Sequence, residues 1–131
     1  MTPVARLVRR RIDPAGLMAD VARPANGAIL LFLGVVRDVN EGRGVTGIEY
    51  SAYESMAESE LAAISNEAQA KFGGQLAIEH RIGELALEEA SVGIAVGHPH
   101  RAEAYEASRW VIEELKRRVP IWKREHLVEA P

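Results

Sequence analysis

Two lysines near the C-terminal end of the sequence stand where their amines could meet. Lys116 falls in the last turn of a predicted helix, and Lys123 falls on the extended segment that follows Pro120. Two ammonium groups held close together each favour loss of a proton from the other, which would supply a neutral amine as base or nucleophile. The alternative is that basic residues simply complement the dipole at the C-terminal end of a helix, and the residues alone favour this alternative.

A second candidate is the run His98-Pro99-His100-Arg101, where a predicted strand meets the start of a helix. Free backbone N–H groups and the helix dipole favour an anion there, and His100 and Arg101 add donors that would suit a phosphate. The alternative is that His100 only caps the helix and that Arg101 is solvated. These four residues leave the two interpretations evenly balanced.

Arg37 is a third candidate because it follows an apolar strand and precedes a loop with two glycines, residues 37–44. An arginine in this position can hold a phosphate or carboxylate with two parallel hydrogen bonds, although surface arginines are common. Tyr50, Tyr53 and Met56 could line a pocket, but such residues more often belong to a core. No set of residues has the spacing of metal ligands, so we expect no metal site.

Three helices and five strands are expected to position these residues. Periodicity and turn residues predict helices at 13–22, 54–72 and 100–119 and strands at 27–36, 45–53, 75–82, 91–98 and 121–128. We expect residues 27–36 to form a central strand and to pair as a hairpin with residues 45–53. The result would be a single α+β domain over residues 1–131, with mainly antiparallel strands, two main amphipathic helices and a short N-terminal helix.

Composition excludes several classes of protein. Apolar residues make up 47% of the chain and charged residues 27%, as in ordinary globular proteins. The absence of cysteine excludes disulfides, thiolate metal sites and a cysteine nucleophile, so any sulfur chemistry needs sulfur from elsewhere. The net charge of −3 argues against nonspecific nucleic-acid binding. The longest apolar run, residues 28–36, is too short to cross a bilayer. No apolar stretch of signal-peptide length follows the N-terminal arginines. We expect these arginines to form a solvated edge and the protein to be cytoplasmic.

Five motifs over residues 27–125 together resemble one family, the large catalytic subunit of molybdopterin synthase. They are Gly-x-x-Arg at 34–37, Tyr-Glu-x-Met-Ala at 53–57, His-Arg-x-Gly at 80–83, the His-Arg pair at 100–101, and Leu-Lys-x-x-x-Pro-Ile-Trp-Lys at 115–123. The combination is specific, although no single piece is. The resemblance implies an α/β-hammerhead-like fold and a homodimer within a heterotetramer, in which each large subunit binds a small ubiquitin-like sulfur carrier. It implies no cofactor.

In this family the carrier's C-terminal Gly-Gly thiocarboxylate enters the large subunit, and two sulfurs pass to cyclic pyranopterin monophosphate to form molybdopterin. By motif, Lys116 and Lys123 resemble the catalytic lysines, with Lys123 nearest the thiocarboxylate carbon and Lys116 assisting proton transfer. Arg37, His100 and Arg101 resemble the set that binds the substrate phosphate. Phe32, Ile112 and Glu125 are expected in the pocket.

The sequence departs from the family at its C-terminal end. The family usually continues through a longer tail with a tryptophan and a basic residue, whereas the printed sequence stops at Pro131. Two alternatives to the enzyme remain open. One is a noncatalytic module that binds a phosphorylated metabolite or a partner's extended tail, and the other is a purely structural subunit with exposed lysines.

Overall fold

The computed structural model describes residues 4–129 as three helices and eight strands. The helices are α1 (Pro14–Val21), α2 (Glu54–Phe72) and α3 (Arg101–Arg118). The strands are β1 (Val4–Val8), β2 (Ala28–Val35), β3 (Val39–Asn40), β4 (Arg43–Ala52), β5 (Gln75–Arg81), β6 (Gly83–Ala86), β7 (Ala90–His98) and β8 (Ile121–Leu127).

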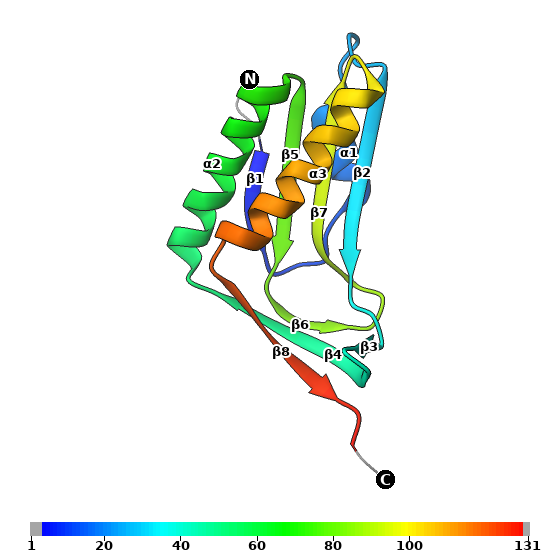
Figure 1. Cartoon of the computed structure of the whole chain (residues 1–131), viewed down its shortest axis with the longest axis vertical. Coiled ribbons are helices and arrows are strands. Elements are labelled where there is room, and N and C mark those ends of the chain that lie inside the picture. The colour runs from blue at the N-terminus through cyan, green and yellow to red at the C-terminus, as the bar shows by residue number, and fades with distance from the viewer. Residues whose placement is uncertain (1–3, 130–131) are drawn as a thin grey trace.

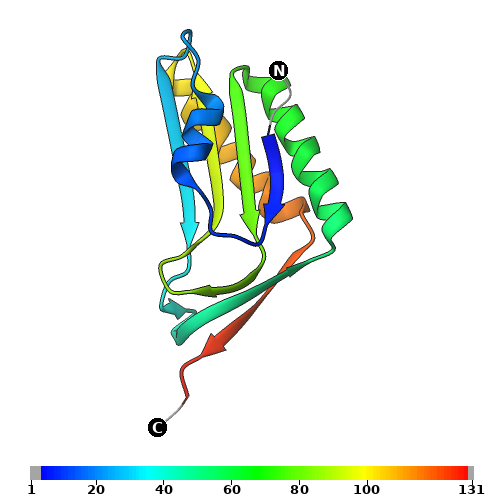
Figure 2. The same cartoon turned by 180° about the vertical axis from the view of Figure 1, so that it is seen from behind.

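Four strands form the main sheet, in the order β1-β5-β7-β2 (Figure 1). β1 runs parallel to β5, and the other two pairings are antiparallel. α2 and α3 cover one face of this sheet, while Figure 2 shows the short α1 on the other face. The α+β class expected from the sequence is therefore confirmed.

The two long helices form where the periodicity predicts them because each presents one apolar face to the sheet. Leu61 and Ile64 of α2 and Val111 of α3 are fully buried, and they pack in one cluster with Ile78 and Ile94 from the centre of the sheet. At roughly 1.5–3 kcal/mol for each large apolar side chain, this burial is the main stabilisation of the helices.

The ends of the helices follow local chemistry. α2 stops at Gly73, whose φ of 77° is a conformation that glycine adopts without strain. Pro120 prevents α3 from continuing and turns the chain into β8. At α1, Asp13 is the N-cap residue and accepts a hydrogen bond from the Gly16 N–H at 3.1 Å.

A second, smaller sheet lies below the first and is built on β4 (Figure 1). β6 and β8 both pair antiparallel with β4, one along each of its edges, and β3 pairs with its first residues. The register places Lys123 of β8 opposite Tyr50 of β4. The C-terminal strand therefore returns to a strand formed much earlier in the chain.

Two expectations about strand pairing were wrong. β2 pairs with β7 rather than with β4, and it is an edge strand of the main sheet rather than a central one. Its position explains why its apolar side chains Ile29, Phe32 and Val35 are 46%, 36% and 52% exposed. Strand pairing depends on contacts distant in sequence, which a local pattern does not encode.

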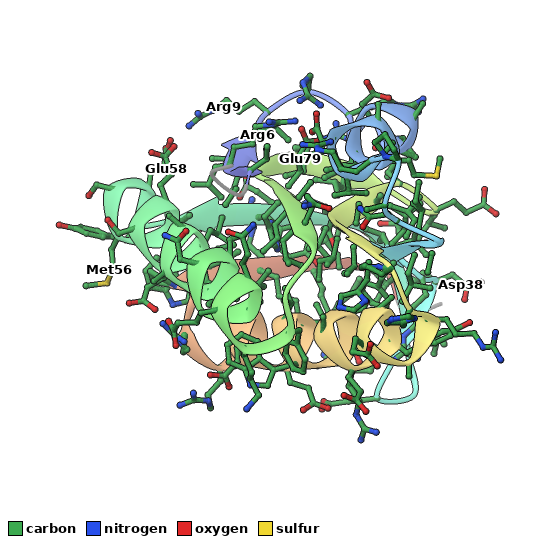
Figure 3. All side chains as sticks on the ribbon, turned by 90° about the horizontal axis from the view of Figure 1, so that it is seen from above. Arg6, Arg9, Asp38, Met56, Glu58 and Glu79 are labelled. Atoms are coloured by element: carbon green, nitrogen blue, oxygen red, sulfur yellow. The ribbon has the colours of Figure 1, made fainter. Side chains whose placement is uncertain are left out.

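The N-terminal arginines belong to an element that the sequence analysis missed, the strand β1 and the turn after it. Arg6 and Arg10 both bind the carboxylate of Glu79, whose side chain is only 1% exposed, with shortest distances of 2.6 Å each. Figure 3 shows Arg6 beside Glu79, and it shows Met56 projecting away from α2. The arginines are thus partly solvated, as expected, but they also hold β1 to the sheet.

None of the helices between residues 4 and 129 has the length and apolar character needed to cross a membrane.

Candidate active site

Six of the eight predicted site residues line one cavity of about 290 Å³ between the two sheets and α3. They come from β2, the loop directly after it, α3 and β8, and Tyr50 of β4 also lines the cavity. The six are Phe32, Arg37, Ile112, Lys116, Lys123 and Glu125. The fold therefore brings together the residues that the motifs at 34–37 and 115–123 single out.

A second cavity of about 310 Å³ adjoins the first. Both are lined by Lys116, Lys123, Tyr50 and Ile112, so the two lysines stand on the wall that the cavities share. The second cavity is otherwise more apolar, and its remaining wall includes His80.

The lysines converge because the chain reverses direction between them. Lys116 lies in the last turn of α3, Pro120 prevents the helix from continuing, and β8 then runs along β4 so that Lys123 lies across from Tyr50. Both side chains are exposed at the mouth of the cavity in the single chain, rather than partly buried.

No ion pair or hydrogen bond joins the side chain of either lysine to another residue between 4 and 129. The neighbouring arginines on α3 differ in this respect. Arg118 binds Glu60 and Glu67 of α2, and Arg117 binds Glu114, with shortest distances of 2.6 to 3.0 Å. The charge of the lysines is therefore available to a ligand.

Arg37 and Glu125 both line the first cavity. Arg37 follows β2 and makes no ion pair with the described residues, whereas Glu125 accepts a hydrogen bond from the Asn40 side chain at 2.9 Å. Asn40 belongs to β3, so this bond ties the loop that carries Arg37 to β8. A free guanidinium beside an apolar wall can bind a phosphate through two parallel hydrogen bonds.

His100 and Arg101 are not part of this cavity. They lie at the N-terminal end of α3, in a separate hollow with Gly27, Ala28, Pro99 and Ala102. From Arg101 to Lys116 the helix rises about 22 Å at about 1.5 Å per residue, which is too far for the two side chains to share one small ligand. The His100 side chain also makes no capping hydrogen bond to the helix.

His98 has a structural role at the same end of α3. It is 7% exposed, its Nε2 lies 2.9 Å from the Phe72 carbonyl oxygen, and its Nδ1 accepts a hydrogen bond from the His100 N–H. The side chain therefore links the end of β7 to the end of α2. Among residues 4–129, no group of three or more His, Asp and Glu side chains could hold a metal ion.

Sequence reasoning gave no site role to two polar residues of the cavity wall, Tyr50 and His80. Tyr50 was weighed as a pocket residue but judged more typical of a core, and His80 entered only as part of a predicted strand and of the motif at 80–83. A polar residue on an otherwise apolar strand face is a recognisable signal, because buried polar groups need partners. Tyr53 and Met56, which were weighed beside Tyr50, are 58% and 53% exposed.

The fold and the cavity define an α+β domain in which lysine and arginine side chains gather in one cavity. Comparison with known proteins names the family. The model of the MoaE protein family matches residues 7–118. The solved molybdopterin synthase of Staphylococcus aureus superposes with a TM-score of 0.91 at 37% identity and covers 96% of this chain and 93% of that one.

Curated relatives agree with this assignment. The molybdopterin synthase catalytic subunit of Thermoplasma volcanium is 43% identical over 92% of this chain and 89% of its own length. That of Halalkalibacterium halodurans is 49% identical over 82% of this chain and 69% of its own length, and the chain spans 64% of the relative from Emericella nidulans. The chain belongs to the MoaE family, the catalytic subunits of molybdopterin synthase, which are sulfurtransferases.

Proposed function

We propose that this chain transfers two sulfurs from the C-terminal thiocarboxylate of a small carrier subunit to cyclic pyranopterin monophosphate, forming molybdopterin. The observation that carries the proposal is the meeting of Lys116, Lys123 and Arg37 in one cavity, each without an acidic partner among the described residues. Unpaired cations in a cleft favour an anionic substrate and stabilise negative charge that develops during reaction.

The sulfur has to arrive with a partner. The chain has no cysteine, so no thiol of its own can carry sulfur between donor and substrate. A solved structure from Helicobacter pylori with the same fold, at 21% identity, is described as a complex of subunits 1 and 2 of molybdopterin-converting factor. A carrier thiocarboxylate fits this requirement: each carrier molecule delivers one sulfur and is left with a carboxylate, whose new oxygen comes from water, so forming the product uses two carriers.

The two adjoining cavities suit two reactants. The cavity with Arg37 and Glu125 is the more polar candidate for the phosphorylated pterin. The second cavity, with Leu115, Val119 and Ile121 in its wall, suits the slender end of the carrier. Both reactants would then meet at Lys116 and Lys123, which are placed to act on the reacting atoms as proton donors or acceptors.

His100 and Arg101 fit this function if a second copy of the chain supplies them. They lie too far from the lysines of their own chain, yet they form a donor-rich helix start with no acidic partner for Arg101 in the described chain. The exposed apolar side chains of the edge strand β2 are a surface that a second copy would cover. The expected homodimer would thus place His100 and Arg101 of one copy in the site of the other.

The test is reconstitution with a thiocarboxylated carrier subunit and cyclic pyranopterin monophosphate, with molybdopterin measured by the fluorescence of its oxidised product. Removing a group that transfers protons or stabilises charge at the reacting atoms costs about a hundredfold or more in kcat, so Lys116→Ala and Lys123→Ala should each lose that much. The matched control is Lys71→Ala. It removes the remaining lysine of the chain, which lies on α2 near Phe72 and Trp110, away from the cavity.

Two results would count against the proposal. Near wild-type product formation by either cavity variant would remove that lysine from the mechanism. Carrier binding without any product from the unaltered protein would instead support a noncatalytic module that holds a phosphorylated metabolite or a partner's tail.

A further inference from the structure

A buried imidazole lies in the wall of the second cavity, and the proposed function gives it no role. His80 is the next-to-last residue of β5, is 5% exposed, and lines the cavity together with Tyr50 and Lys116. In the sheet it lies between Leu7 of β1 and Val92 of β7. A polar ring in such surroundings is costly unless its nitrogens have partners.

One ring nitrogen has a fixed partner. Nδ1 of His80 lies 2.9 Å from the carbonyl oxygen of Arg81. A carbonyl oxygen can only accept, so Nδ1 must carry the hydrogen, and a neutral imidazole then keeps Nε2 as an acceptor. Between residues 4 and 129, no hydrogen bond occupies Nε2.

The ring is held both neutral and in one orientation. Burial is the largest influence and lowers the pKa of His80 to about 4; the bond to the Arg81 carbonyl opposes this shift, and the nearby charge of Lys116 adds to it. His80 is therefore uncharged at neutral pH. The ring of Tyr50 packs edge-on against it, with centroids 5.4 Å apart and planes at 70°.

We propose that His80 is a positioning residue for Lys116: its Nε2 accepts a hydrogen bond from the lysine amine, directly or through one water, and holds that amine toward the reacting atoms. The proposal rests on the proposed function of Lys116. A carboxylate in this place would form an ion pair and keep the lysine protonated, whereas a neutral acceptor orients the amine and leaves it free to release a proton.

Two substitutions separate the acceptor from the bulk of the ring. In His80→Gln the side-chain oxygen can replace Nε2 as acceptor, whereas His80→Phe fills the space without any acceptor. Because misorientation of a reacting group costs rate rather than substrate binding, we expect kcat to fall about tenfold or more in His80→Phe, with KM little changed, and to stay within about threefold in His80→Gln. A Phe variant with full kcat, or a folded Gln variant as impaired as Phe, would overturn the proposal.

A measurement that needs no catalysis tests the contact itself. The ¹⁵N chemical shifts of the His80 ring, recorded at neutral pH in the unaltered protein, should show that Nδ1 is protonated and that Nε2 is unprotonated. Lys116→Ala should shift the Nε2 signal, and Lys71→Ala should not. A protonated Nε2, or an Nε2 chemical shift that Lys116→Ala leaves unchanged, contradicts the proposal even if His80→Phe fails to fold.

The two experiments distinguish failure of this inference from failure of the proposed function. If Lys116→Ala still forms product, the role of the lysine fails, whatever the His80 signals show. If Lys116→Ala is inactive while His80→Phe is folded and fully active, only the positioning role of His80 fails.

Discussion

Unpaired positive charge distinguishes the cavity residues from most other arginines of the described chain. Nine arginines between residues 4 and 129 bind a carboxylate: Arg6, Arg9, Arg10, Arg11, Arg81, Arg109, Arg117, Arg118 and Arg124. Arg37, Lys116 and Lys123 do not, although they lie within one cavity. An anion that enters this cavity meets cations that have no intramolecular bond to break, which favours binding.

Arg37 provides a prediction about substrate binding. A charge-assisted hydrogen bond contributes about 1.5–3 kcal/mol, so Arg37→Ala should raise KM for the cyclic phosphate substrate about 10- to 100-fold while the carrier still binds. Steady-state kinetics at varied substrate concentration measure this change. Arg43→Ala is the matched control, because Arg43 is exposed at the start of β4 and lines neither cavity. Equal KM values for the two variants would show that Arg37 does not bind the substrate.

The fold brings some of the motif residues together in one cavity and leaves others outside it. The motif at 115–123 identified Lys116 and Lys123, and the cavity unites them with Phe32, Arg37, Ile112 and Glu125. Tyr50 and His80 received no site role because a strand pattern says which face a side chain occupies and not whether that face meets a cavity. His100 and Arg101 satisfied a local pattern for anion binding, but the rise of the predicted helix, about 1.5 Å per residue, already separates them from Lys116.

Elements are held together in this fold by buried charge as well as by apolar packing. Glu79 of β5 accepts hydrogen bonds from Arg6 of β1 and from Arg10, and Arg6 also reaches Asp20 of α1 at 3.4 Å. Burial alone would raise the pKa of Glu79, but the hydrogen bonds and charges of Arg10 and Arg6 outweigh it and lower that pKa. The ionised carboxylate therefore stabilises the docking of β1 and α1.

Glu79→Gln should destabilise the fold, and it should do so in a pH-dependent way. Removing one partner of a buried ion pair costs about 3–5 kcal/mol, and because both arginines are half exposed we expect about 1–3 kcal/mol at pH 7. A folded pKa below the unfolded one gives stability that is present above the unfolded value, about 4.3, and is lost as pH falls through the folded value. The difference between the two proteins should therefore shrink below about pH 4.

Urea unfolding at pH 7 and near pH 3 measures both parts of this prediction. Glu54→Gln is the control, because Glu54 forms an exposed ion pair with Arg9 on the surface and should change the unfolding midpoint little. A Glu79→Gln protein as stable as the unaltered one at pH 7 would contradict a stabilising role for the buried carboxylate.

The sequence predicted elements with strong periodicity almost to the residue and missed those without it. α2 begins and ends at the predicted residues, and α3 differs by one residue at each end. β1 was missed because its apolar residues merge into a run of arginines, and β6 because four residues carry little pattern. The hairpin of residues 27–36 with 45–53 was wrong because the partner of β2 is β7, more than fifty residues further along the chain.

At the scale of the whole molecule, the position of His100 and Arg101 predicts a shared site. If each site of a homodimer takes its lysines from one copy and Arg101 from the other, a Lys116→Ala/Arg101→Ala heterodimer keeps one intact site. Co-refolding equal amounts of the two inactive variants should then restore about a quarter of the unaltered activity, because about half of the dimers are mixed and each has one intact site.

The control for complementation is a mixture of Lys116→Ala and Lys123→Ala. Both lysines line the same cavity of one chain, so every site in a mixed dimer lacks one of them and no activity should return. If the first mixture also stays inactive although exchange of subunits is verified by mass spectrometry, His100 and Arg101 do not complete the site of a second copy.

The pairing of β8 with β4 also determines when during synthesis the cavity can exist. Tyr50 leaves the ribosome long before Lys123, yet the two lie opposite each other in the finished sheet. The main sheet and the helices can fold on a nascent chain while the edge of β4 that pairs with β8 is still unpaired. The amine of Lys123 then joins that of Lys116 only after β8 has been synthesised, so a growing polypeptide lacks this part of the cavity wall until β8 has paired with β4.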